Sequence, residues 1–94
     1  MKKADKERYQ KLIDLGCIVC LIFEEVYTPP EIHHPYGRKG NGNQKTYPLC
    51  FLHHNSRVDC DDYTSRHPYK FKFEERYDTD ENLLEETNRL IGSS

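Results

Sequence analysis

The chain has 94 residues, of which 35% are hydrophobic and 32% charged, and its formal net charge is −2. A chain of this length buries a modest fraction of its surface, so we predict one domain over residues 1–94 with a thin core that a metal or a disulfide would stabilise. No apolar run approaches the roughly 18 residues that cross a bilayer, and no signal-type apolar core follows the basic start, so we expect a cytoplasmic protein.

The charges are distributed unevenly. Residues 1–13 carry five basic and two acidic side chains, and residues 36–72 carry seven and three. By contrast, residues 14–35 hold four acids and no base, and residues 73–94 hold seven acids and two bases. The two basic segments suit a polyanionic partner, although such segments are also typical of an ordinary solvated surface.

The first predicted element is a helix over about residues 4–15. Tyr9, Leu12 and Ile13 are spaced along one face of this helix. Gly16 stands at the position that favours glycine after a helix C-terminus. We therefore expect this helix to pack through its Tyr9 face and to end before Gly16.

The next segments are predicted to be mostly extended or irregular. Residues 17–20, CIVC, read as a tight turn, and residues 21–34 read as two short extended pieces. Pro29 and Pro30 separate these pieces, because proline cannot donate to a strand ladder. Residues 35–46 contain three glycines and two asparagines, a composition that predicts a loop.

The second half is predicted to contain mainly helices. Residues 47–58 read as a short strand that leads into a helix. Residues 68–77 read as another helix with Pro68 in its first turn, where proline is tolerated. The aromatic residues that recur every four positions along it are Tyr69, Phe73 and Tyr77.

The last predicted element is an amphipathic helix over about residues 80–91. Asp80 is the expected N-terminal cap, and Gly92 is the expected C-terminal stop. This helix either packs on the domain or joins a second chain, and the sequence specifies no oligomeric state. Its apolar stripe comprises Leu83, Leu84, Thr87, Leu90 and Ile91.

Two short pairs of residues have the spacing of zinc ligands. Cys17 and Cys20 form a C-x2-C pair, and Cys50 and His53 form a C-x2-H pair thirty residues later. Zinc takes four such ligands in a tetrahedron, so we predict a structural zinc site. A redox C-x2-C pair and unrelated buried cysteines are the alternatives. Cys60 lies in an acidic stretch and reads as a spare thiol.

The remaining histidines exceed what one zinc site needs. Adjacent side chains on a helix diverge by about 100°, so His53 and His54 can face different sites. A lone histidine is most often a surface or packed residue, but four together favour a second site. The four are His33, His34, His54 and His67.

The order of these motifs resembles a known nuclease family. CIVC, EIHH, GNGNQKTYPLCFLHH and HPYKFKFEERY, over about residues 9–77, resemble the HNH endonucleases of the ββα-metal (His-Me finger) type. More narrowly, they resemble the phage recombination enhancement function (Ref) nucleases. The resemblance implies an α+β fold: a small zinc-stabilised ββα-metal domain with flanking helices, a core of about residues 9–77 and the amphipathic helix at about 80–91.

The resemblance also implies a function. It implies an endonuclease that hydrolyses DNA phosphodiester bonds with low sequence specificity, uses a divalent cation, acts in phage recombination and depends on the RecA filament. By the same resemblance, His34 is the general base, and the ligands of the catalytic metal are His33, His54 and His67. A neutral imidazole, with a pKa of roughly 6.5, can accept a proton from water near neutral pH.

The histidine pairs leave two questions about the site open. Three imidazoles do not identify the cation, which could be Mg²⁺, Mn²⁺, Zn²⁺ or Ni²⁺. Neighbouring strand residues point to opposite faces, so His33 and His34 can serve one site only if the strand ends or twists there. Pro35 favours such an ending. Asn41 and Asn43 lie in the loop and receive no role.

Basic residues beside the histidines are candidate DNA contacts. Backbone contacts of this kind position a nucleic acid without reading its sequence. The candidates are Arg38, Lys39, Lys45, Arg57, Arg66 and Lys70, with Lys72 close by. The competing interpretation is a non-catalytic zinc module for nucleic acid or protein, which needs only the four zinc ligands. A disulfide-stapled interaction protein, which would bind no metal, is the third.

Overall fold

The structure is a computed structural model and describes residues 2–92. It is a small α+β fold, as predicted, with four α-helices and one two-stranded sheet in this part of the chain. None of the helices among residues 2–92 has the length and apolar character to cross a membrane. In chain order the elements are α1 (Lys3–Leu15), the π-helix η1 (Cys20–Glu24), β1 (Glu31–His33), the 3-10 turn η2 (Gly42–Gln44), β2 (Tyr47–Leu49), α2 (Phe51–His54), α3 (Lys70–Arg76) and α4 (Asp80–Ile91).

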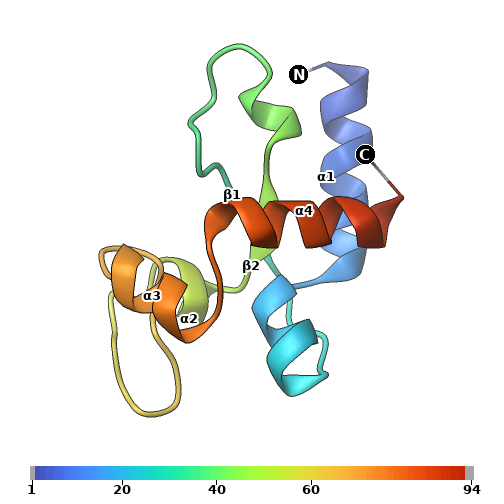
Figure 1. Cartoon of the computed structure of the whole chain (residues 1–94). Coiled ribbons are helices and arrows are strands. Elements are labelled where there is room, and N and C mark those ends of the chain that lie inside the picture. The colour runs from blue at the N-terminus through green and yellow to red at the C-terminus, as the bar shows by residue number, and fades with distance from the viewer. Residues whose placement is uncertain (1, 93–94) are drawn as a thin grey trace.

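The two strands form the centre around which the helices are arranged (Figure 1). β1 and β2 pair antiparallel, with Glu31 opposite Leu49 and His33 opposite Tyr47. Both α1 and α4 contact β2 and each other, and α2 continues directly from the end of β2. The C-terminal helix therefore packs on the domain, and α2 contacts β1, so that the side chains of His33 and His54 meet.

The core merges with the cysteine cluster. The largest fully buried side chains are Tyr47 and Leu49 of β2, Phe73 of α3 and Leu12 of α1. All of residues 17–20 are buried with them, at 4% exposure or less. Any ion held by these cysteines would therefore sit inside the core, so metal binding and folding are linked.

The helix α1 has the predicted limits but a different buried face. Leu12 is fully buried as expected, whereas Ile13 is 44% exposed and Tyr9 is half-buried. Arg8 is buried instead, because its guanidinium donates to the hydroxyl and the backbone carbonyl of Thr46. The glycines predicted to close helices are confirmed, with φ of 82° and 76°, at Gly16 and Gly92.

Residues 18–24 are helical, so the predicted tight turn and first extended piece are wrong. Residues 18–19 are α-helical and continue into η1, and the amide of Leu21 donates to the carbonyl of Cys17 at 3.0 Å. The β-branched residues of this segment favour extended backbone. The helical conformation prevails because the Cys17 and Cys20 sulfurs can approach each other only if the chain turns back between them.

The start of α3 also differs from the prediction. The strand that leads into α2 is confirmed, but α3 begins at Lys70, so Pro68 lies before the helix rather than in its first turn. The amides of residues 66–67 donate to the backbone carbonyls of residues 53–54 at 2.8 and 3.0 Å. These bonds hold residues 66–67 against α2, so that α3 begins only at Lys70.

The predicted cap of α4 is wrong by one residue. The hydroxyl of Thr79 caps the helix by accepting from the amide of Asn82 at 3.2 Å. Asp80 is buried in the first turn, where its carboxylate accepts from the Tyr47 hydroxyl at 2.7 Å and from the Arg66 guanidinium at 2.8 and 3.1 Å. Burial opposes ionisation, but the nearby His33 imidazole together with these two donors outweighs it and lowers the pKa of Asp80. Asp80 thus ties α4 to the sheet.

Candidate metal centres

Four buried side chains from two separate segments converge at the first centre. They are Cys17, Cys20, Cys50 and His53, and their ligating atoms all lie within 4.8 Å of one another. The sulfurs of Cys20 and Cys50 are 3.8 Å apart, and the Cys20 sulfur is 3.6 Å from Nδ1 of His53. Ligands of a tetrahedral zinc, with Zn–S bonds of about 2.3 Å, stand about 3.6 to 3.8 Å apart. Both the donor set and its spacing fit zinc.

Local backbone geometry explains how the cluster forms. Cys17 follows α1, and its sulfur accepts from the backbone amide of Cys20 at 3.5 Å. Cys50 is the N-cap residue of α2, and His53 is three residues further along. Residues three apart in a helical turn lie on the same face. Each pair is therefore pre-arranged within a short segment, and the tertiary fold only has to bring the two pairs together.

Charge in the cluster favours a bound cation. The neighbouring Cys17 thiol and His53 lower the pKa of Cys50, whereas Cys50 and burial raise the pKa of Cys17. Cys50 therefore gives up its proton most readily, and the thiolate is the form that binds metal. All four cysteines are free thiols, and Cys60 is exposed and lies outside the cluster.

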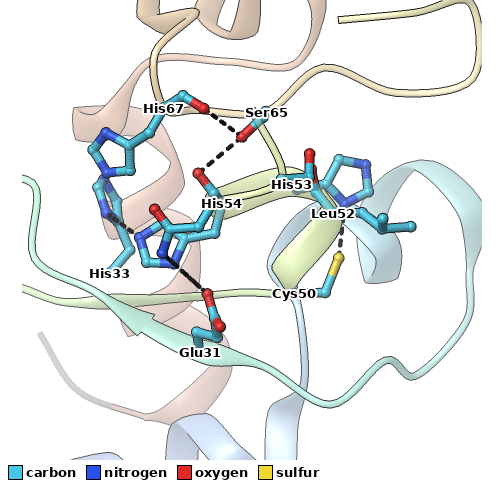
Figure 2. A network of polar contacts seen from close by, with 10 residues as sticks. Glu31, His33, Cys50, Leu52, His53, His54, Ser65 and His67 are labelled. Carbon is cyan, nitrogen blue, oxygen red and sulfur yellow. Dashed lines mark hydrogen bonds and ion pairs between the residues drawn. The ribbon is translucent and has the colours of Figure 1, made fainter. Parts of the chain in front are cut away.

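Three histidines form a second centre (Figure 2). His33 comes from β1, His54 from α2 and His67 from the segment before α3, and one nitrogen of each lies within 4.8 Å of the others. Nδ1 of His33 and Nε2 of His54 are 3.1 Å apart. Adjacent ligands of one ion at about 2.1 Å are separated by about 3.0 to 3.4 Å. The structure therefore groups the three predicted ligands and turns His53 and His54 toward different clusters.

A carboxylate supports this second centre. Oε1 of Glu31 lies 2.8 Å from Nδ1 of His54, so it holds the proton on Nδ1 and leaves Nε2 directed at the cluster. Glu31 was missed in the sequence, although residues 31 and 33 lie on the same face of a strand. That alternation is the signal in EIHH that places Glu31 beside His33.

His33 is the most buried member of the centre. Its Nε2 is buried, has no hydrogen-bond partner in the described part of the chain, and lies 3.8 Å from Oδ1 of Asp80. Burial lowers the pKa of His33 to about 4 and also lowers that of His67. Both imidazoles are therefore neutral near pH 7, as a metal ligand must be. Beside them, the Ser65 hydroxyl donates to the backbone carbonyls of His54 and His67 (Figure 2).

His34 points to a separate hydrogen-bond network. The strand β1 ends at His33, which meets the condition under which His33 and His34 could serve one site. Nε2 of His34 lies 2.9 Å from the Tyr9 hydroxyl and 3.1 Å from Oδ1 of Asn43. The Asn43 amide nitrogen donates to Asp5 at 3.3 Å. Neither Tyr9 nor Asn43 was assigned to the site from sequence, because they lie 34 residues apart.

Most of the predicted DNA-contacting residues are exposed, with one exception. The exposed ones are Arg38, Lys39, Lys45, Arg57 and Lys70. Arg66 is 7% exposed, and its guanidinium is occupied by the Asp80 carboxylate. We therefore remove Arg66 from the candidate contacts. Lys72 is exposed but pairs with Asp59 at 3.0 Å.

The contact between Glu31 and His54 makes a measurable prediction. Glu31→Gln should weaken divalent-metal binding at the three-histidine centre by about 10-fold to 100-fold, because a carboxylate that accepts a hydrogen bond from a ligating imidazole orients that ring. Titration calorimetry with Mn²⁺ on zinc-loaded protein measures this affinity. The control is Glu75→Gln, an exposed residue of α3. Equal affinities for both variants would exclude the orienting role.

Comparison with known proteins identifies the family. The model of the family described as recombination enhancement, RecA-dependent nuclease, matches residues 2–92. No curated protein matches the chain significantly. The matched range includes both histidine pairs and all of the ligands described above. The chain therefore belongs to the recombination enhancement, RecA-dependent nucleases, the Ref family that its motifs resemble.

Proposed function

We propose that the protein is a metal-dependent DNA endonuclease of the HNH type, in which β1, β2 and α2 form a ββα-metal unit within a single domain. The observation that carries the proposal is the arrangement of four histidines. Three of their imidazoles cluster, and the fourth histidine, His34, has hydrogen bonds of its own. A zinc in the cysteine cluster would stabilise the fold, and a divalent cation would be held by His33, His54 and His67. The nuclease character of the family supports this reading.

His34 is suited to the role of general base. The Asn43 amide nitrogen donates to Asp5, so its oxygen faces His34 and accepts from Nε2–H. The lone pair is then on Nδ1, which is the atom that would take a proton from the attacking water. Burial, followed by the charge of Arg38, lowers the pKa of His34, so the imidazole is neutral near pH 7. Tyr9 and Asn43 act as positioning residues.

The second centre would supply the electrostatic part of the reaction. A divalent cation bound there would stabilise the charge that develops on the scissile phosphate and on the leaving oxygen. The protein's own contribution is to hold three imidazoles in place through burial, Glu31 and the Ser65 hydroxyl. The exposed basic residues would grip the DNA backbone and give low sequence specificity. By family membership, cleavage in recombination depends on RecA.

A cleavage assay tests the proposal. Supercoiled plasmid and single-stranded DNA are incubated with Mg²⁺ or Mn²⁺, each with and without RecA filaments. Wild type should cut, and His34→Ala should cut about 10²-fold to 10⁴-fold more slowly, the usual contribution of a general base. If both proteins leave the DNA intact in every arm, the nuclease proposal fails and a non-catalytic zinc module remains. The matched control, His34→Gln, keeps a polar side chain but cannot accept the proton and should be equally slow.

A further inference from the structure

A groove lies between η1 and α4. It has a volume of about 830 Å³ and is lined by Ile22 and Phe23 of η1 and by Leu83 of α4, among others. Ile22 is 43% exposed and Phe23 is 50% exposed, although both are large apolar side chains. Figure 1 shows η1 beneath α4. The groove therefore offers an apolar floor that the domain itself leaves partly uncovered.

The rim of this groove is acidic. Asp78, Glu85 and Glu86 line it, and among its lining residues the only base is Arg89, which pairs with Glu86. Both walls come from the acidic parts of the chain, because residues 14–35 contain no base and residues 73–94 carry seven acids against two bases. A nucleic acid backbone is repelled by such a rim, whereas a basic segment of a protein is attracted.

A buried acceptor in the groove wall lacks a partner. Oδ1 of Asn88, which lines the groove, is buried and has no hydrogen-bond partner among residues 2–92. A buried carbonyl oxygen left unpaired costs free energy that a donor from a ligand would recover. An arginine, a lysine or a backbone amide of a bound segment supplies such a donor. The apolar floor, the acidic rim and this acceptor describe one kind of occupant.

We propose that this groove docks a segment of the RecA filament that presents an apolar side chain flanked by lysine or arginine. The inference rests on the RecA dependence in the proposed function and adds the surface that mediates it. Charge assigns the two surfaces to different partners. The basic residues of segments 1–13 and 36–72 would contact DNA, and the acidic groove would contact protein. One molecule can then contact both components of a nucleoprotein filament at once.

Co-sedimentation with RecA filaments assembled on single-stranded DNA tests the docking surface. Phe23→Ser and Glu85→Lys should each weaken binding by about tenfold or more, because the first removes an apolar anchor and the second reverses a rim charge. The controls are Phe71→Ser, at an 80% exposed residue of α3, and Glu7→Lys on α1, and both should bind like wild type. Zinc content and circular dichroism establish that each variant is folded.

The binding assay separates this inference from the nuclease proposal, because it needs no cleavage. If wild type binds filaments and Glu85→Lys binds equally well, the groove is not the RecA surface, whatever the cleavage result. Absence of any filament binding by wild type also overturns the inference. If instead light scattering finds a dimer of the chain that Phe23→Ser and Glu85→Lys disrupt, the occupant is a second copy and the proposal is wrong. Failure to cut DNA with intact filament binding would overturn only the nuclease assignment.

Discussion

Replacing His53 with alanine should unfold the protein at room temperature. Structural zinc sites bind with an apparent free energy of about 10 to 16 kcal/mol, which is as large as the entire stability of a small domain, about 5 to 15 kcal/mol. The hydrophobic core cannot compensate for the lost metal, because Cys17 and Cys20 of the cluster are themselves part of that core. Far-UV circular dichroism and zinc content per chain measure the outcome. We expect loss of helical signal together with loss of the metal.

Two comparisons make this prediction specific. A strong chelator should unfold wild type in the same way, and added zinc should refold it. Cys60→Ser removes a thiol outside the cluster and should leave both the zinc content and the melting transition unchanged. A His53→Ala protein that still melts cooperatively at the wild-type temperature would contradict a structural role for the site.

Replacing the adjacent residue, His54, should leave the protein folded but inactive. His54→Ala keeps all four residues of the cysteine cluster and removes one of three ligands at the second centre. A cation that stabilises the developing phosphate charge contributes several kcal/mol, so cleavage should fall by about 10³-fold or more. The plasmid assay measures the rate, and calorimetry with Mn²⁺ measures the lost site.

The required observations for His54→Ala are retained zinc, a wild-type circular dichroism spectrum and loss of the second metal. An exposed residue of the same helix provides the control: Leu52→Ala should keep both metals and full cleavage. If His54→Ala cleaves at the wild-type rate, the three-histidine centre is not the catalytic one. If it unfolds, the two centres are not independent, and the division between His53 and His54 is wrong.

The sequence was sufficient wherever the physical determinant is local. The C-x2-C and C-x2-H spacings bring each pair of candidate ligands together within one turn of chain, so the clustering of these four residues could be predicted from the sequence. The same holds for the glycines that end α1 and α4, since their positive φ angles favour glycine. The divergence of His53 and His54 also follows from helix geometry within α2.

Tertiary contacts decided the features that the sequence alone did not predict. The sequence places Arg66 among the candidate DNA contacts, but its buried guanidinium is paired with the carboxylate of Asp80, 14 residues away. Glu31 supports His54 across 23 residues, and Tyr9 meets Asn43 across 34. Such partners depend on how β1, β2, α1 and α4 pack, and no local pattern encodes that packing. The sequence alone was therefore enough to name the candidate ligands. The charge state and orientation of those ligands, and the groove between η1 and α4, arise only when distant segments exclude water around them.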